Sequence, residues 1–289
     1  MAHEKRSARI LALILAVIMV ASALVYIFRS PSVKEGREIK FDMGNEWNDW
    51  IKYLPNSTEY VIYANLREKN ETLKVFIYNQ TIENLNPYVF RDFRPTSFEK
   101  IMIIDYYNYL IDVNRSKVYF AYQMKDKYKN FTLKTGISAG RFYTVVDETH
   151  PVILAHPKYA KAIIDSIHDS ENFTSKYNYT SRIDGKFSYV FIVAGDLAKR
   201  TLTDNGTPIA DFYFEGYRMN GSIYEKVVGI HFLKYYFFAN KTENVTYYYY
   251  KNYDDYFSIA RIGSYNLYNL TIIMPEIRTV IIKFGNETS

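Results

Sequence analysis

The sequence contains no cysteine and only two glutamines, Gln80 and Gln123. The absence of cysteine excludes disulfides and thiolate metal sites, so a domain of this length must be held together by its apolar core. Few glutamines beside many charged residues are typical of proteins from thermophiles. The 21 asparagines depart from that trend and need a separate explanation.

The net positive charge is also small. The net charge is +5, and the first 29 residues supply +3 of it, from four Lys/Arg and one Glu, which leaves +2 for the rest. A nucleic-acid-binding domain would carry a concentrated basic patch. We therefore expect no nucleic-acid partner.

Motifs that would indicate chemistry are missing as well. The histidines show neither the H-x-x-x-H nor the H-E-x-x-H spacing of a helical zinc site. Residues 136–140 fit G-x-S-x-G, but a strand-like run follows where a nucleophile elbow needs a helix, which indicates a glycine-flanked turn. The aspartate-rich turns lack the EF-hand pattern. We expect no catalytic residue, no metal and no cofactor, and hence no enzyme.

An uncharged apolar run occupies residues 10–28. As a helix it would span roughly 28 Å, close to the hydrocarbon thickness of a bilayer. The cations before it predict a cytoplasmic tail at residues 1–9 and a single-pass anchor in the cell membrane, with the C-terminal domain extracellular. A signal peptide cleaved near Ala21-Ser22-Ala23 is the main alternative, and a buried soluble helix is another. The first two interpretations both export the rest of the chain.

Acceptor motifs for N-linked glycans are the strongest signal. Asn-x-Ser/Thr occurs thirteen times, whereas chance would give roughly two or three occurrences. The acceptors are Asn56, Asn70, Asn79, Asn114, Asn130, Asn172, Asn178, Asn205, Asn220, Asn240, Asn244, Asn269 and Asn286. This enrichment explains the excess of asparagine, and it predicts that most acceptors lie on exposed turns or strand ends.

A polar stalk is predicted at residues 29–45, followed by an extracellular domain at 46–289. Residues 46–54 are expected to form a short helix with Trp47 and Trp50 on one face. These tryptophans are interpreted either as an interfacial membrane anchor or as a contact with the domain's own core, and we favour the core.

The remainder is mostly β in pattern, with an Asn220-Gly221 hairpin turn. Strands are predicted at 60–64, 117–123, 141–146, 151–155, 188–194, 211–218, 222–233, 246–250, 257–262 and 279–284, and helices from Pro157 and over 196–202 and 265–270.

Two stretches open on similar residues, Tyr60-Val61-Ile62 and Tyr189-Val190-Phe191. They suggest two degenerate repeats, with halves at 55–170 and 184–285. The expected fold class is α+β, an antiparallel β-sheet ectodomain with a few helices on one face of the sheet.

The chain resembles uncharacterised membrane-anchored surface proteins of archaea and bacteria in the order of its first segments. These are an N-terminal apolar segment, Leu54-Pro55 and the strand that opens at Tyr60. The resemblance covers the start of the chain and the approximate order of strands and helices. It implies a surface location and carries over no functional residue.

The leading hypothesis is a non-enzymatic surface protein that binds or scaffolds a partner, such as an envelope or surface-layer protein. The alternatives are an envelope hydrolase with dispersed carboxylates and a surface-filament subunit. Because glycans exclude a partner from the surface they cover, the expected contact face is residues 131–171, a stretch without acceptor motifs. In the competing interpretation this stretch is simply buried core. The candidate contact residues are Arg141, Tyr143, His156, Lys158 and Lys161.

Overall fold

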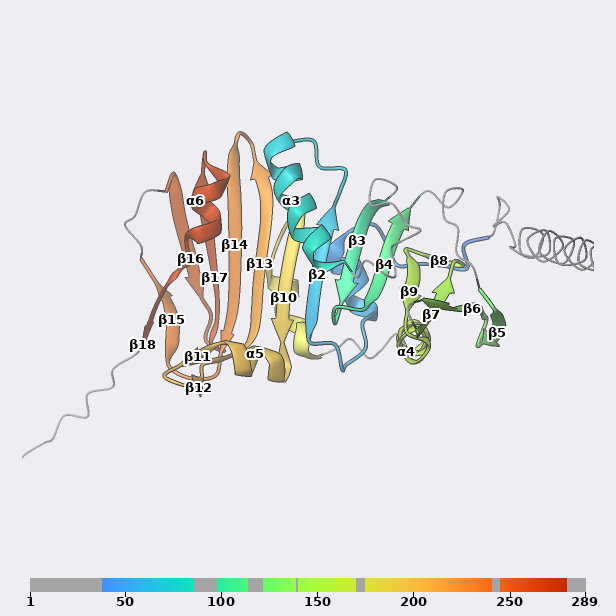
Figure 1. Ribbon diagram of the computed structural model, residues 1–289. Coiled ribbons are helices and arrows are strands. Elements are labelled where there is room, and N and C mark those ends of the chain that lie inside the picture. The colour runs from blue at the N-terminus through green and yellow to red at the C-terminus, as the bar shows by residue number, and fades with distance from the viewer. Residues whose placement is uncertain are drawn as a thin grey trace, which may run out of the picture.

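The computed structural model describes residues 38–85, 98–113, 122–138, 140–169, 175–240 and 245–279. One twelve-stranded sheet dominates this part of the chain (Figure 1), and every pairing within it is antiparallel. Its strand order is β16-β17-β14-β13-β10-β2-β3-β4-β9-β7-β6-β5. The fold is therefore mostly antiparallel β with a few helices, in agreement with the α+β class.

The sheet strands are β2 (Tyr60–Asn65), β3 (Phe98–Ile104), β4 (Asn108–Val113), β5 (Met124–Tyr128), β6 (Phe131–Ser138), β7 (Arg141–Val146), β9 (Val152–Ala155), β10 (Tyr189–Ala194), β13 (Ala210–Asn220), β14 (Ile223–Phe232), β16 (Tyr247–Asn252) and β17 (Phe257–Ser264). Three small ladders add β1 (Phe41–Asp42) with β8 (Thr149–His150), β11 (Thr203–Asp204) with β12 (Thr207–Pro208), and β15 (Tyr236–Ala239) with β18 (Glu276–Thr279). The helices are α2 (Trp47–Trp50), η1 (Ile51–Tyr53), α3 (Glu71–Asn84), α4 (Pro157–His168), η4 (Ser175–Arg182), α5 (Gly195–Thr201) and α6 (Leu267–Ile272).

On each side of the central β2–β10 pair, the first four strands follow one another outward in the order in which they occur in the sequence. Outward from it run β2, β3, β4 and β9 in one direction and β10, β13, β14 and β17 in the other. Ile62 pairs with Phe191, and the neighbouring pairs are symmetric about them, because Tyr60 faces Val193 and Tyr189 faces Ala64. The similar openings at Tyr60 and Tyr189 therefore lie side by side at the middle of the sheet.

Apolar side chains of successive strand residues enter two different cores, one on each face of the sheet. Val61 and Tyr63 belong to the core that also contains residues of α2, η1, α4 and η4. Ile62 and Ala64 belong to the core that contains residues of α3, α5 and α6. Figure 1 shows α3 and α6 over the same face. The expectation that the helices cover one face is therefore wrong: β-strands with apolar residues on both sides need cover on both.

Local sequence signals explain where the helices begin. Asn70 caps α3, because its Oδ1 accepts the Leu73 amide at 3.0 Å. Pro157 opens α4, whose Ile163 and Ile167 lie on its buried face. The short helix at residues 47–50 buries Trp47 and Trp50 almost completely, as the core interpretation predicted.

The folded domain begins before Glu46, the residue at which the sequence predicted its start. β1 pairs in parallel with β8, and Met43 is 3% exposed in the core. Residues 41–43 are therefore part of the domain. The predicted membrane span at 10–28 lies outside the described residues, and none of the described helices is long and apolar enough to cross a membrane.

The predicted hairpin of the second half is present, but its turn is shifted by one residue. Asn220 pairs with Ile223 as the last residue of β13, so the turn is Gly221-Ser222. Positive φ occurs at Gly221 and not at Asn220, which is extended at the strand end. An Asn-Gly pair with positive φ at both residues does turn a hairpin, at Asn205-Gly206 between β11 and β12.

Other predicted elements differ at their ends. The 117–123 run falls almost entirely outside the described residues, and the last predicted strand is described only as far as Thr279. The cap of α5 is Ala194, and Asp196 lies in its first turn instead.

Candidate functional site

Three of the five predicted contact residues gather in one cleft of about 470 Å³, which we call the Tyr107 cleft. Its lining comes from the β3–β4 turn, the start of β7 and the start of α4. The lining residues are Tyr107, Asn108, Gly140, Arg141, Phe142, Tyr143 and His156.

The turn that supplies Tyr107 has an unusual backbone. Asp105 and Tyr106 both have positive φ, 46° and 65°, although neither is glycine. Local contacts offset the cost of this conformation. The Asp105 carboxylate accepts the amides of Glu59 and Tyr60 at 3.0 and 3.1 Å, and the Tyr106 ring stacks on the Tyr60 ring with centroids 4.1 Å apart. The turn is therefore fixed, and Tyr107 follows it 45% exposed.

Arg141 provides the positive charge of the cleft. Its guanidinium lies over the Tyr107 ring, 4.8 Å from the centroid. Tyr143 is 3% exposed, which corrects the expectation that its side chain is free at the surface. Burial raises the pKa of the Tyr143 hydroxyl, and the neighbouring Arg141 opposes that shift. The cleft thus pairs an exposed guanidinium with two tyrosine rings.

Two further residues shape the rim. The buried Asn108 accepts the His156 amide through Oδ1 at 3.1 Å, which fixes the start of α4. Phe142 is 46% exposed and pairs across the hairpin with Ile137, which is 53% exposed. Directly opposite residues share a face of a hairpin, so these two exposed side chains lie side by side, and Phe142 is the one that belongs to the lining.

The remaining predicted contact residues lie outside this lining. Lys158 is exposed in the first turn of α4. Lys161 lies over the ring of Tyr128, with its Nζ 5.1 Å from the centroid. The pentapeptide 136–140, once a candidate elbow, joins β6 to β7 as strand, turn and strand, because Ser138 pairs with Arg141.

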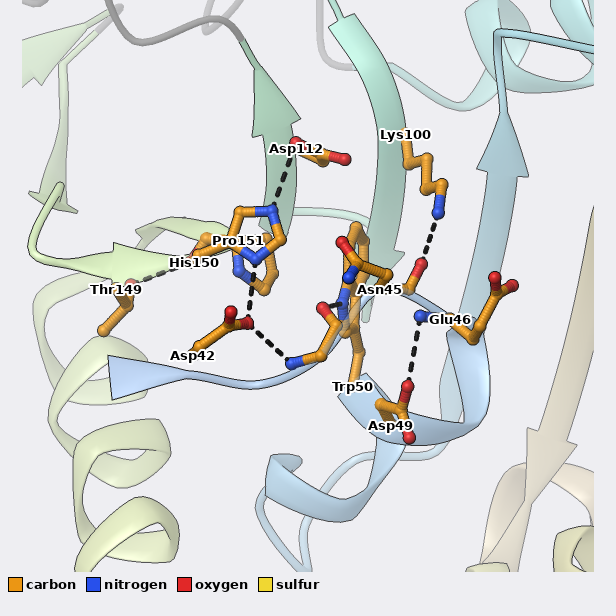
Figure 2. A network of polar contacts seen from close by, with 11 residues as sticks. Asp42, Asn45, Glu46, Asp49, Trp50, Lys100, Asp112, Thr149, His150 and Pro151 are labelled. Carbon is orange, nitrogen blue, oxygen red and sulfur yellow. Dashed lines mark hydrogen bonds and ion pairs between the residues drawn. The ribbon is translucent and has the colours of Figure 1, made fainter. Parts of the chain in front are cut away.

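A second polar cluster, which sequence reasoning missed, surrounds His150 (Figure 2). Its Nδ1 lies 2.9 Å from Asp42 and its Nε2 lies 3.3 Å from Asp112. These residues are 108 and 38 positions from His150 in sequence, so no local spacing could have revealed the cluster. The two carboxylates, led by Asp112, raise the pKa of His150 against the effect of its partial burial.

The His150 cluster fastens the N-terminal segment to the sheet. The Asp42 carboxylate also accepts the Gly44 amide at 2.8 Å, and the Gly44 carbonyl accepts the Trp50 indole N–H at 2.8 Å. Lys100 on β3 donates to the Asn45 carbonyl. Figure 2 shows these contacts as one chain from β4 to α2. These contacts join five elements, β1, β3, β4, β8 and α2, and both carboxylates are already used as acceptors.

Seven of the nine described acceptor asparagines are exposed. Asn56, Asn79, Asn130, Asn178, Asn205, Asn220 and Asn240 are exposed, and Asn70 and Asn269 are half-buried. Asn114, Asn172, Asn244 and Asn286 lie outside the described residues. None of the nine described acceptors lines the Tyr107 cleft. Within the described part of the chain, no group of three or more His, Cys, Asp or Glu side chains could hold a metal ion.

Comparison with known proteins places the chain in an archaeal family. A family model named AF_2048_N, described as a family N-terminal domain, matches residues 42–168. An uncharacterised protein of Archaeoglobus fulgidus is 32% identical over 305 residues, covering 98% of this chain and 97% of the relative. The chain belongs to the same family as that protein. No solved structure matches it.

Proposed function

We propose that this protein is an N-glycosylated, single-pass surface protein that binds another protein of the cell envelope through the Tyr107 cleft and catalyses no reaction. The exposed acceptors support the glycosylation, and the apolar run at 10–28 supports the anchor. The exported location rests on the same two features.

The observation that carries the binding role is the composition of the Tyr107 cleft. Arginine and aromatic residues contribute most of the energy in protein interfaces, because each combines a large apolar surface with a directional polar group. Here the exposed Arg141 and Tyr107 contact each other, Phe142 also belongs to the lining, and none of the described acceptors does. A partner could therefore dock there beside glycans attached elsewhere on the domain.

The proposal is tested by affinity purification of the full-length protein from native membranes, followed by quantitative mass spectrometry. The Arg141→Glu variant should reduce recovery of the partner at least about tenfold, because it replaces the cation at the centre of the contact with a repelling charge. Its melting temperature should change little, since Arg141 is exposed. Arg200→Glu, an exposed cation on α5, is the matched control and should leave recovery unchanged.

Charge reversal at Lys158 and Lys161 tests how far the contact surface extends beyond the lining of the Tyr107 cleft. Because both lie outside the lining, their reversal should weaken recovery less than Arg141→Glu does. A partner that survives Arg141→Glu, or the absence of any reproducible partner, would contradict the binding role.

A further inference from the structure

A second cleft, of about 360 Å³, lies at the β16 end of the sheet, far from the Tyr107 cleft in strand order. It is lined by three cations, Arg182, Lys251 and Arg261, and three tyrosines, Tyr249, Tyr250 and Tyr253. We propose that this cleft, which we call the Arg261 cleft, binds an acidic saccharide, with a sugar carboxylate on Arg261 and a pyranose ring against Tyr249. The proposal does not depend on the binding role of the Tyr107 cleft.

Strand register places the central residues on one face. Tyr249 of β16 is directly opposite Arg261 of β17, and Lys251 is opposite Ile259. Opposite residues share a face, and so do residues two apart in a strand, so all four side chains project to the same side of the sheet. Ile259 is 8% exposed and forms an apolar floor, whereas Tyr249 is 67% exposed. The outer strands (Figure 1) therefore present a flat aromatic ring beside a guanidinium.

The wall of the cleft is held in place before any ligand arrives. Arg182, at the end of η4, forms an ion pair with Asp255 at 2.7 Å. Its guanidinium also lies over the rings of Tyr253 and Phe257, 5.0 and 5.8 Å from the centroids. A side chain fixed by three contacts loses little freedom on binding, which favours affinity.

Arg261 differs from Arg182 in having no ion-pair partner within the described part of the chain. Asp184 is the one acid in the lining, and its backbone carbonyl accepts Arg218 at 2.9 Å. With Arg182 neutralised by Asp255, the cations Arg261 and Lys251 outnumber that acid. The cleft therefore has an excess of positive charge for an anionic ligand.

The combination of groups selects the ligand class. A guanidinium forms two parallel hydrogen bonds with a carboxylate. Tyrosine offers an apolar ring face to the C–H groups of a sugar and a hydroxyl to its oxygens. The volume suits one or two sugar rings, at the small end of ligand pockets. An acidic sugar uses the charge, the ring faces and the hydroxyls together.

The test is calorimetric titration of the full-length, detergent-solubilised protein with tri-galacturonate, a carboxylated trisaccharide. A neutral galactose trisaccharide, inorganic phosphate and adenosine monophosphate are the comparison ligands. We expect the acidic trisaccharide to bind at least roughly tenfold more tightly than each comparison ligand, and more weakly as salt increases. Arg261→Gln should weaken that binding by about tenfold or more, because it removes a charge-assisted pair.

Two variants make the result specific. Tyr249→Ala should also weaken binding, whereas Arg141→Gln in the Tyr107 cleft should leave it unchanged. Equal binding of the neutral trisaccharide would overturn the role of the charge. Tighter binding of phosphate or the nucleotide, or full binding by the Arg261→Gln protein, would overturn the assignment to an acidic sugar at this site.

Discussion

The two halves of the sheet share a strand order but differ at their outermost strands. At one end, β5 is an exposed edge strand that carries Lys125, Asp126 and Lys127. At the other end, β16 carries four consecutive tyrosines at 247–250. Charges at an edge prevent pairing with another chain, whereas tyrosines leave it attractive to ligands. The sheet therefore has one edge strand whose charges oppose pairing with another chain, β5, and one whose tyrosines can contact a ligand, β16.

Each half also buries a lysine with an acid. In the first half, Lys134 is paired with Asp147, and in the second half Lys226 lies 3.3 Å from Glu215. Glu215 additionally accepts the hydroxyls of Tyr213 and Tyr217. Burial lowers the pKa of Lys226 despite the nearby carboxylate. Glu215 is thus the acceptor for three groups of the second half.

The largest expected effect is at Glu215. Glu215→Ala should reduce the free energy of unfolding by about 3–5 kcal/mol, because it leaves a buried ammonium and two tyrosine hydroxyls without their acceptor. Urea denaturation measures the loss, with Glu215→Gln as the control that retains an acceptor oxygen and should lose less. Equal losses for the alanine and glutamine variants would show that Glu215 does not act as an acceptor.

Glycines provide a smaller contrast. A Cβ at Gly263 of β17 would overlap the Tyr247 ring, which lies against this glycine, so Gly263→Ala should cost about 1–3 kcal/mol. Gly140 in the first half has φ +74° and open space around it. Gly140→Ala should therefore cost only about 1 kcal/mol, from backbone strain alone. Thermal unfolding compares them, and a larger loss at Gly140 would mean that the tyrosine row is not seated on Gly263.

The smallest expected effect is a pH dependence that belongs to the first half. Because the folded state raises the pKa of His150, its stabilising contribution is complete below the unfolded value of about 6.5 and disappears as pH rises through the folded value. His150 is partly exposed, so we expect about 1 kcal/mol or less. The free energy of unfolding is measured at pH 5.5 and at pH 8.5. Its decrease between the two pH values should be larger in the wild type than in His150→Gln by that amount. An unchanged difference in the variant would assign the pH dependence to other groups.

Sequence patterns predicted the elements whose signals are local. The aromatic and β-branched residues of 141–146 gave β7 with both ends correct, and Pro157 with its spaced isoleucines gave α4. The helix α3 has a weaker pattern, since Val75, Tyr78 and Ile82 are exposed apolar residues that blur its buried face. Strand β5 has no apolar alternation, because an edge strand with both faces in water needs none.

The candidate sites show the same limit. Arg141, Tyr143 and His156 were selected because their stretch contains no acceptor, and strand order then brought them to one cleft. Tyr107 joins them only because β4 is next to β9, which is next to β7. That neighbour relation depends on pairing between distant segments, and no local pattern in the sequence records it.

The central claim, a glycosylated surface protein, is tested most directly by glycopeptide mapping of the protein purified from native membranes. Mass spectrometry before and after enzymatic release of N-glycans should show glycans on several of the exposed acceptors, such as Asn56, Asn130, Asn205 and Asn240. Four acceptors precede a buried hydroxyl two residues on, at Thr58, Thr81, Thr132 and Thr180, so any glycan there must be attached before folding. Peptides that cover all thirteen acceptors in unmodified form would contradict the proposal.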